Sequence, residues 1–183
     1  MRQNGRLIVL TGKSGSGKST LAKYMSELGV QVIKPYTTRI KRGAEDTDYN
    51  FVSYREFFDM YADFTAVAEY ETSYGVWHYG FKIPYLEEDS IIILNPKQIN
   101  KFKHFNPMVI YLEISNEILL DRLSARMDDL ESKRRFNSDV VDFKHIQHTA
   151  DIIVDCKDKT VEEIAEELAL GVEKIKGKEI NRK

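Results

Sequence analysis

Short apolar runs alternate with longer amphipathic segments along most of the chain. The apolar runs cover residues 7–10, 31–33, 91–94, 108–112 and 151–155. Segments with apolar residues at helical spacing follow the first, fourth and fifth of these runs. Because such strand and helix alternation is typical of βαβ units, the pattern predicts an α/β fold with a parallel sheet covered by helices. In folds of this type, ligands bind at the carboxyl ends of the strands.

Two of the expected helices have clear start signals. Thr160 and Glu163 form a capping box before an apolar stripe that continues to about residue 175. Ser115 stands at an N-cap position after the run at 108–112. The helix that it opens places Arg122 and Arg126 four residues apart, on one face.

The sequence pattern changes between residues 35 and 85, where short aromatic-rich segments replace the alternation of apolar runs and amphipathic segments. A strand is expected at 48–52, a short helix after the capping box of Ser53 and Glu56, and two paired strands at 64–69 and 76–79. These segments are too short for a second core. We therefore predict one domain with a core (1–34, 86–126 and 139–176), an inserted substrate-binding lobe (about 35–85), a densely charged lid (about 127–138) and a charged tail (177–183). Asp139 and Phe143 are expected to pack the lid against the core.

Composition narrows the class of protein. With 183 residues, 42% apolar and 31% charged, the chain is expected to fold as one globular domain. A formal net charge of −2 provides no basic field for nucleic acid or an anionic membrane, and no apolar run is long enough to span one. The single cysteine, Cys156, cannot form an intramolecular disulfide, which fits a cytoplasmic protein.

Residues 12–19 follow the phosphate-binding pattern G-x-x-x-x-G-K-[ST], directly after the first expected strand and before the first expected helix. Glycines let backbone N–H groups surround anionic oxygens, Lys18 reaches the β and γ phosphates, and the Ser19 hydroxyl holds Mg²⁺. The segment therefore predicts ATP as a ligand and Mg²⁺ as its cofactor. The expected ATP-binding residues of this segment are Gly12, Ser14, Gly15, Ser16, Gly17, Lys18, Ser19 and Thr20.

A second cationic cluster suggests where the phosphoryl group goes. Arg39 and Arg42 are three residues apart, and two guanidinium groups can converge on one phosphate. Without other evidence, two arginines at this spacing more often lie on a solvent-exposed face and bind no ligand.

Several motifs together resemble the guanylate kinase family. They are the phosphate loop, Thr37-Thr38-Arg39-x-x-Arg42, residues 48–53, Glu69 followed by Tyr79-Gly80, and Arg122-Leu123-x-x-Arg126. The resemblance covers nearly all of the chain and implies a P-loop kinase fold with a nucleoside monophosphate (NMP)-binding lobe and a helical lid. It implies that Arg39, Arg42, Tyr49 and Tyr79 hold the acceptor phosphate and that Glu69 hydrogen-bonds guanine.

The chain departs from that family where the base is read. Pro35 and Phe81 stand where the family commonly has small hydroxyl residues, and Asn95-Pro96 replaces an acidic strand end. Because polar pockets reject wrong bases by leaving their partner groups unpaired, these changes weaken the expectation of guanine specificity.

The charged lid and the helix before it supply the expected catalytic arginines. Arg122 and Arg126 are expected to bind ATP, and Lys18, Arg126 and one of Arg134 and Arg135 to stabilise the transferred phosphoryl group. Without a phosphate loop, we would interpret these arginines as partners in surface ion pairs.

We therefore expect an enzyme that transfers the γ-phosphoryl group of ATP to GMP or dGMP with Mg²⁺. The alternatives are a related kinase for another NMP or ribose 1,5-bisphosphate, and a non-catalytic binding module of the same fold. Small-molecule nucleotides are the expected partners, without nucleic acid or membrane, for a monomer or a homodimer.

Overall fold

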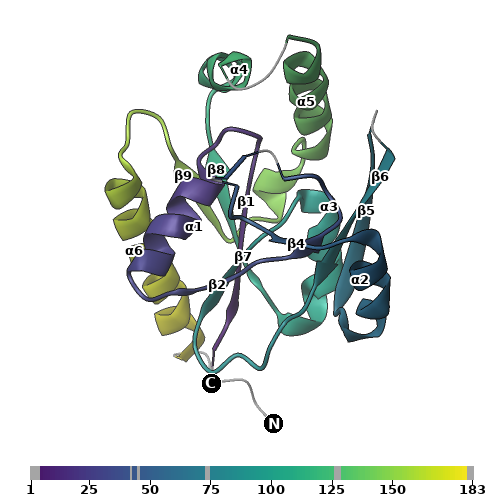
Figure 1. The fold of residues 1–183 in the computed structure, drawn as a ribbon. Helices are drawn as coiled ribbons and strands as arrows, with labels where there is room; N and C mark the ends of the chain where they lie inside the picture. The colour runs from purple at the N-terminus through teal and green to yellow at the C-terminus, as the bar shows by residue number, and fades with distance from the viewer. Residues whose placement is uncertain (1–4, 42, 45, 73–74, 126–128, 181–183) are drawn as a thin grey trace.

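The computed structural model describes residues 5–41, 43–44, 46–72, 75–125 and 129–180, and it contains a central parallel sheet (Figure 1). The strand order is β2-β7-β1-β8-β9, and every pairing is parallel. The strands are β1 (Leu7–Gly12), β2 (Gln31–Ile33), β7 (Ser90–Ile93), β8 (Met108–Glu113) and β9 (Ile152–Asp155). The predicted α/β class is confirmed, and each apolar run forms a strand of this sheet.

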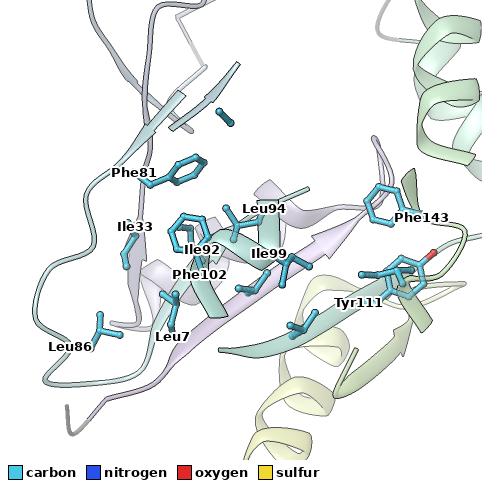
Figure 2. Close-up of a cluster of buried hydrophobic side chains, with 14 residues drawn as sticks. Leu7, Ile33, Phe81, Leu86, Ile92, Leu94, Ile99, Phe102, Tyr111 and Phe143 are labelled. Carbon is cyan, nitrogen blue, oxygen red and sulfur yellow. The ribbon is translucent and has the colours of Figure 1, made fainter. Parts of the chain in front are cut away.

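Helices cover both faces of the sheet because successive strand residues point to opposite sides. Ile8 and Leu10 of β1 pack with α1 (Lys18–Glu27) and α6 (Val161–Ile180) in one apolar cluster. Leu7 and Val9 belong to the opposite cluster, which includes residues of α3 (Pro96–Ile99) and of the 3₁₀ helix η2 (Asn100–Phe105) (Figure 2). The central strand is therefore buried on both faces.

The inserted lobe is a second, four-stranded sheet with the order β4-β3-β6-β5. Its elements are β3 (Tyr36–Thr37), β4 (Asn50–Phe51), α2 (Tyr54–Asp59), the 3₁₀ helix η1 (Tyr61–Asp63), β5 (Ala66–Thr72) and β6 (Gly75–Phe81). The predicted Ser53–Glu56 capping box and the antiparallel pairing of the two long strands are confirmed. The strand expected at 48–52 is shorter than predicted, with two residues in β4.

The β5–β6 hairpin has two chemically different faces. In its register Ala68 lies opposite Tyr79, Glu69 opposite His78 and Tyr70 opposite Trp77. Directly opposed residues share a face, and neighbours along a strand alternate between faces. Ala68 belongs to the core cluster of the main sheet, so the face that carries Ala68, Tyr70 and Tyr79 is the inner face.

The outer face of the hairpin is covered by α2. The His78 ring lies 5.5 Å from the Phe57 ring and 5.4 Å from the Tyr54 ring, measured between centroids. Glu69 shares this outer face because it is paired with His78.

The helix before the predicted lid and the helix that contains most of that lid lie together at one end of the molecule (Figure 1). These are α4 (Asn116–Ser124), which has Ser115 as its N-cap, and α5 (Asp129–Asp142), which the 3₁₀ helix η3 (Ile146–His148) follows after three residues. Phe143 is buried against Tyr111, so the segment after α5 packs on the core as expected. Helix α6 continues through Ile180, into the part predicted as a charged tail. Among the described residues, no helix is long and apolar enough to cross a membrane.

Candidate functional site

The phosphate-binding loop lies at the carboxyl end of β1, the central strand of the sheet. Gly15 and Gly17 have φ angles of 90° and 95°, which favour glycine. A Cβ atom at Gly12 would lie 2.5 Å from Ser16 Oγ and 2.9 Å from the Leu112 carbonyl oxygen. The loop therefore needs its glycines for both conformation and close packing.

Two cationic side chains reach this loop. Lys18 Nζ donates hydrogen bonds to the carbonyl oxygens of Gly12 and Lys13, at 2.7 and 2.9 Å. Arg122 of α4 donates from Nη1 to the Gly15 carbonyl oxygen at 2.9 Å. The structure thus places Lys18 and Arg122, both predicted as ATP-binding residues, against the same loop.

A carboxylate from the lid region also contacts the loop. The Ser14 backbone N–H donates to Asp139 Oδ2 at 2.5 Å, and Asp139, on α5, is 7% exposed. Phosphate-binding loops use such N–H groups to hold anionic oxygens, and here the carboxylate accepts from one of the residues predicted to bind ATP.

The Ser19 hydroxyl, the predicted metal ligand, contacts the inserted lobe. It donates to Asp48 Oδ2 at 2.6 Å. A hydroxyl and a carboxylate are hard oxygen donors, so this pair fits Mg²⁺. Across the described part of the chain, no group of three or more His, Cys, Asp or Glu side chains is placed to hold a metal ion.

A cavity of about 260 Å³ opens beside the loop. It is lined by residues of the loop, α1, α4, β8, the connection between β9 and α6, and the start of α6, among them Gly15, Gly17, Thr20, Arg122, Cys156 and Lys159. Thr20, a predicted ATP contact, thus lines this cavity. Burial raises the pKa of the Cys156 thiol to about 11, and the neighbouring Asp155 adds to the shift.

Arg39, the first predicted acceptor-binding residue, is buried with an acidic partner. Its Nη2 lies 2.8 Å from Asp46 Oδ2, and Nη1 donates to the Ile40 carbonyl oxygen at 3.1 Å. The guanidinium carbon is 4.8 Å from the centre of the Tyr49 ring. Asp46 is therefore the anionic partner of the guanidinium group that was predicted to bind an acceptor phosphate.

The two predicted acceptor tyrosines lie together and continue to a third tyrosine. The Tyr49 and Tyr79 ring centroids are 5.6 Å apart, and those of Tyr79 and Tyr70 are 5.2 Å apart at 87°. Burial raises the pKa of Tyr70 to about 12, with smaller contributions from Tyr79, Tyr49 and Asp142. Tyr70 was not predicted from the sequence, because the face of the hairpin on which it lies depends on the pairing register.

Glu69, the predicted guanine contact, is not placed with these tyrosines, and Phe81 and Asn95, which depart from the family pattern, are used for packing and capping. Glu69 lies on the outer face of the hairpin, with Oε1 3.4 Å from His78 Nδ1. Phe81 is 2% exposed and packs its ring 5.4 Å from the Phe102 ring in the core (Figure 2). Asn95 caps α3, accepting a hydrogen bond from the Lys97 backbone N–H at 3.0 Å.

Some of the predicted site residues are not among the residues that the structure describes. Arg42 and Arg126 are outside the described residues, and the side chain of Arg135 is not described. Arg134 is exposed on α5.

Three acidic contacts were missed as site features. Asp46 and Asp48 come from a short loop without hydrophobic periodicity, and Asp139 was predicted as a packing residue only. The phosphate-binding pattern carries no position for a carboxylate, so no sequence signal selected them.

The comparisons with known proteins agree with this arrangement. A family model described as an AAA domain matches residues 8–144. Guanylate kinases from two strains of Helicobacter pylori are each 32% identical over 144 residues, which cover 70% of this chain and 68% of theirs.

Two solved structures have a similar fold. A guanylate kinase from Anaplasma phagocytophilum has a TM-score of 0.63 at 17% identity, covering 94% of this chain and 87% of that one. A gluconokinase from Sinorhizobium meliloti 1021 has a TM-score of 0.55 at 14% identity, covering 100% and 99%. The geometry of the phosphate loop and the identity to the Helicobacter pylori proteins lead to one conclusion: the chain belongs to the guanylate kinase family and is a phosphotransferase of the P-loop kinase type.

Proposed function

We propose that this protein transfers the γ-phosphoryl group of ATP to a nucleoside monophosphate, with GMP and dGMP as the first acceptors to test. One observation carries the proposal. The loop at residues 46–48 joins the two halves of the site, because Asp48 contacts Ser19 of the phosphate loop and Asp46 contacts Arg39. Ser19 and Arg39, which we assign to the donor and acceptor sites, therefore contact the two ends of one three-residue segment.

The chain's own groups provide the positioning and charge that phosphoryl transfer needs. Lys18 and Arg122 approach the loop where the β and γ phosphates of ATP bind. The Ser19 hydroxyl, with Asp48 beside it, would hold Mg²⁺, which supplies positive charge to the phosphate oxygens. Since the attacking oxygen of an acceptor phosphate is already anionic, the transfer requires no general base.

On the acceptor side, Arg39 would exchange the Asp46 carboxylate for the acceptor phosphate. The hydroxyl groups of Tyr49 and Tyr79 complete the polar surface around that phosphate. A guanidinium group binds a phosphate and a carboxylate with the same planar set of donors, so this exchange conserves its hydrogen bonds.

A second candidate is a kinase for a different phosphate-bearing acceptor, such as another NMP or ribose 1,5-bisphosphate. It is favoured by the positions of Phe81 in the core and Asn95 at a helix cap, because neither offers a polar group to guanine. A non-catalytic binding module of this fold is the third possibility, and the complete phosphate loop argues against it.

A coupled assay for ADP release separates these functions. The acceptors are GMP, dGMP, AMP, CMP, UMP, TMP and ribose 1,5-bisphosphate, each with ATP and Mg²⁺. Turnover with GMP or dGMP supports the proposal, and turnover with the sugar phosphate alone rejects it. ATP binding by calorimetry without acceptor-dependent ADP release would indicate the binding module.

Lys18→Ala tests whether the observed turnover belongs to this protein. We expect it to lower kcat by at least about 100-fold, because it removes the cation from the transferred phosphoryl group. Lys23→Ala, an exposed lysine on the same helix, is the matched control and should retain full activity.

A further inference from the structure

The acceptor half of the site is a row of rings that starts at Arg39. The Arg39 guanidinium lies over Tyr49, the Tyr49 ring contacts Tyr79, and the Tyr79 ring contacts Tyr70. Each contact is between groups on the inner side of the lobe or on the loop that precedes β4. The row therefore connects Arg39, where we assign the acceptor phosphate, to Tyr70 through two intervening rings.

Tyr70 remains partly exposed to solvent. Tyr70 is 37% exposed, whereas Tyr79 beside it is less exposed and packs against the core. The neighbouring carboxylate of Asp142 is already engaged, since it accepts from Asn95 Nδ2 at 3.2 Å and lies 2.6 Å from Lys97 Nζ. The side chains of Asn95, Lys97 and Asp142, which follow β7 or lie at the end of α5, are therefore paired with one another.

Glu69 cannot join this surface without a change of register. It belongs to the opposite face of the hairpin, where its nearest described partner is His78. A one-residue slip of β5 would bring Glu69 inward, but it would also move Ala68 out of the core and turn Tyr70 away from Tyr79. The packing of the lobe thus opposes the carboxylate contact that the sequence predicted.

We propose that Tyr70 is the base-recognising residue, that it stacks its ring on the acceptor base, and that the acceptors are therefore nucleoside monophosphates with little discrimination among bases. This inference rests on the proposed function and specifies its acceptor. Stacking tolerates different bases because every base has a π face, whereas a carboxylate selects hydrogen-bond donors.

Acceptor binding measured by calorimetry tests the assignment. The probes are GMP, AMP, CMP and ribose 5-phosphate, which has the phosphate without the base. Tyr70→Ala should weaken binding of all three nucleotides by roughly 5- to 100-fold, the range for loss of one stacked base, and should leave ribose 5-phosphate unchanged. Tyr70→Phe should retain nucleotide binding because it keeps the ring.

Two further variants serve as controls. Tyr54→Ala removes a 63% exposed tyrosine from the outer side of the same lobe and should leave nucleotide affinity unchanged. Glu69→Gln should change the affinity for GMP by less than about twofold, since the carboxylate is on the other face. Thermal unfolding of each variant checks that the lobe remains folded.

Defined results overturn the inference. Unchanged nucleotide affinity in a folded Tyr70→Ala variant rejects it, as does selective loss of GMP binding in Glu69→Gln. Either result, together with continued GMP phosphorylation, leaves the proposed function intact. If no nucleotide in the panel is bound or phosphorylated while ATP still binds, the proposed function itself fails, and the base assignment fails with it.

Discussion

Replacement of Asp46 by Asn tests whether its carboxylate occupies the place of the acceptor phosphate. The Arg39 and Asp46 side chains are 4% and 11% exposed, so their ion pair is nearly buried. Loss of one partner from a buried pair typically costs about 3–5 kcal/mol, because the other charge is left uncompensated. Asn keeps one acceptor oxygen for Arg39, so we expect a smaller loss of about 2–3 kcal/mol in the free energy of unfolding.

In Asp46→Asn, the acceptor GMP should also raise the stability of the protein more than it does in the natural protein. In the proposed function, Arg39 of the natural protein releases Asp46 before it binds a phosphate, whereas in Asp46→Asn this competing charge is absent. We therefore expect tighter GMP binding and a stability difference that shrinks when GMP is saturating, because the phosphate then compensates Arg39.

Chemical and thermal unfolding with and without GMP measure both effects. For a chain of this length, 1 kcal/mol corresponds to roughly 2–4 °C in Tm, so the expected loss is about 4–12 °C without GMP. Asp59→Asn is the matched control, because its pair with Arg55 is 3.9 Å long with side chains 92% and 71% exposed. We expect that control to change stability by less than about 0.5 kcal/mol.

Two results would refute the reasoning about Asp46. An equal loss of stability with and without saturating GMP would mean that the acceptor phosphate does not replace the carboxylate. Weaker GMP binding in Asp46→Asn would mean that Asp46 assists the acceptor rather than competing with it.

Three other changes probe the remaining contacts. Asp48→Asn should weaken Mn²⁺ binding to the ADP complex by about 10-fold in electron paramagnetic resonance titrations, while ADP binding without metal stays unchanged. An unchanged Mn²⁺ affinity would mean that Asp48 does not contribute to a metal site at Ser19. Asp139→Asn should tighten ATP binding in calorimetry, since it removes a negative charge from the Ser14 N–H, and weaker binding would contradict this. Because burial raises the pKa of Cys156 from 9.0 to about 11, its thiolate fraction at pH 8 should be about 100-fold below that of an unshifted thiol, and alkylation should be slow until urea unfolds the chain. The raised pKa of Cys156 also makes the free energy of unfolding fall as the pH rises from about 9 towards 11. Fast alkylation of Cys156 in the folded protein at pH 8 would contradict the raised pKa and therefore both expectations.

Local patterns in the sequence predicted the parts of the site that are continuous in the chain. The phosphate loop, its strand and its helix are specified by residues 7–27, and the capping boxes at Ser53 and Thr160 form as expected. These features depend on hydrogen bonds and backbone conformations within a few residues. Such interactions are visible in the sequence because both partners are close together in it.

The acceptor half was predicted less completely, because its partners come from separate segments. Arg39, Tyr49 and Tyr79 lie together, as the family resemblance implied, but Asp46 was not expected beside Arg39. Glu69 and Phe81 share a hairpin with Tyr79, yet Glu69 faces α2 and Phe81 enters the core.

By itself, the sequence of this protein determined the α/β class, the order along the chain of the five strands of the main sheet, and the position of the phosphate-binding loop. Its apolar periodicity and glycine positions act over a few residues, so they need no distant partner. Only the tertiary structure decided which side of the β5–β6 hairpin faces the site and which carboxylates contact Ser14, Ser19 and Arg39. The physical reason is that a strand alternates its faces at every residue, so the side on which Tyr70 and Glu69 lie is set by the pairing register and the packing of the lobe on the core.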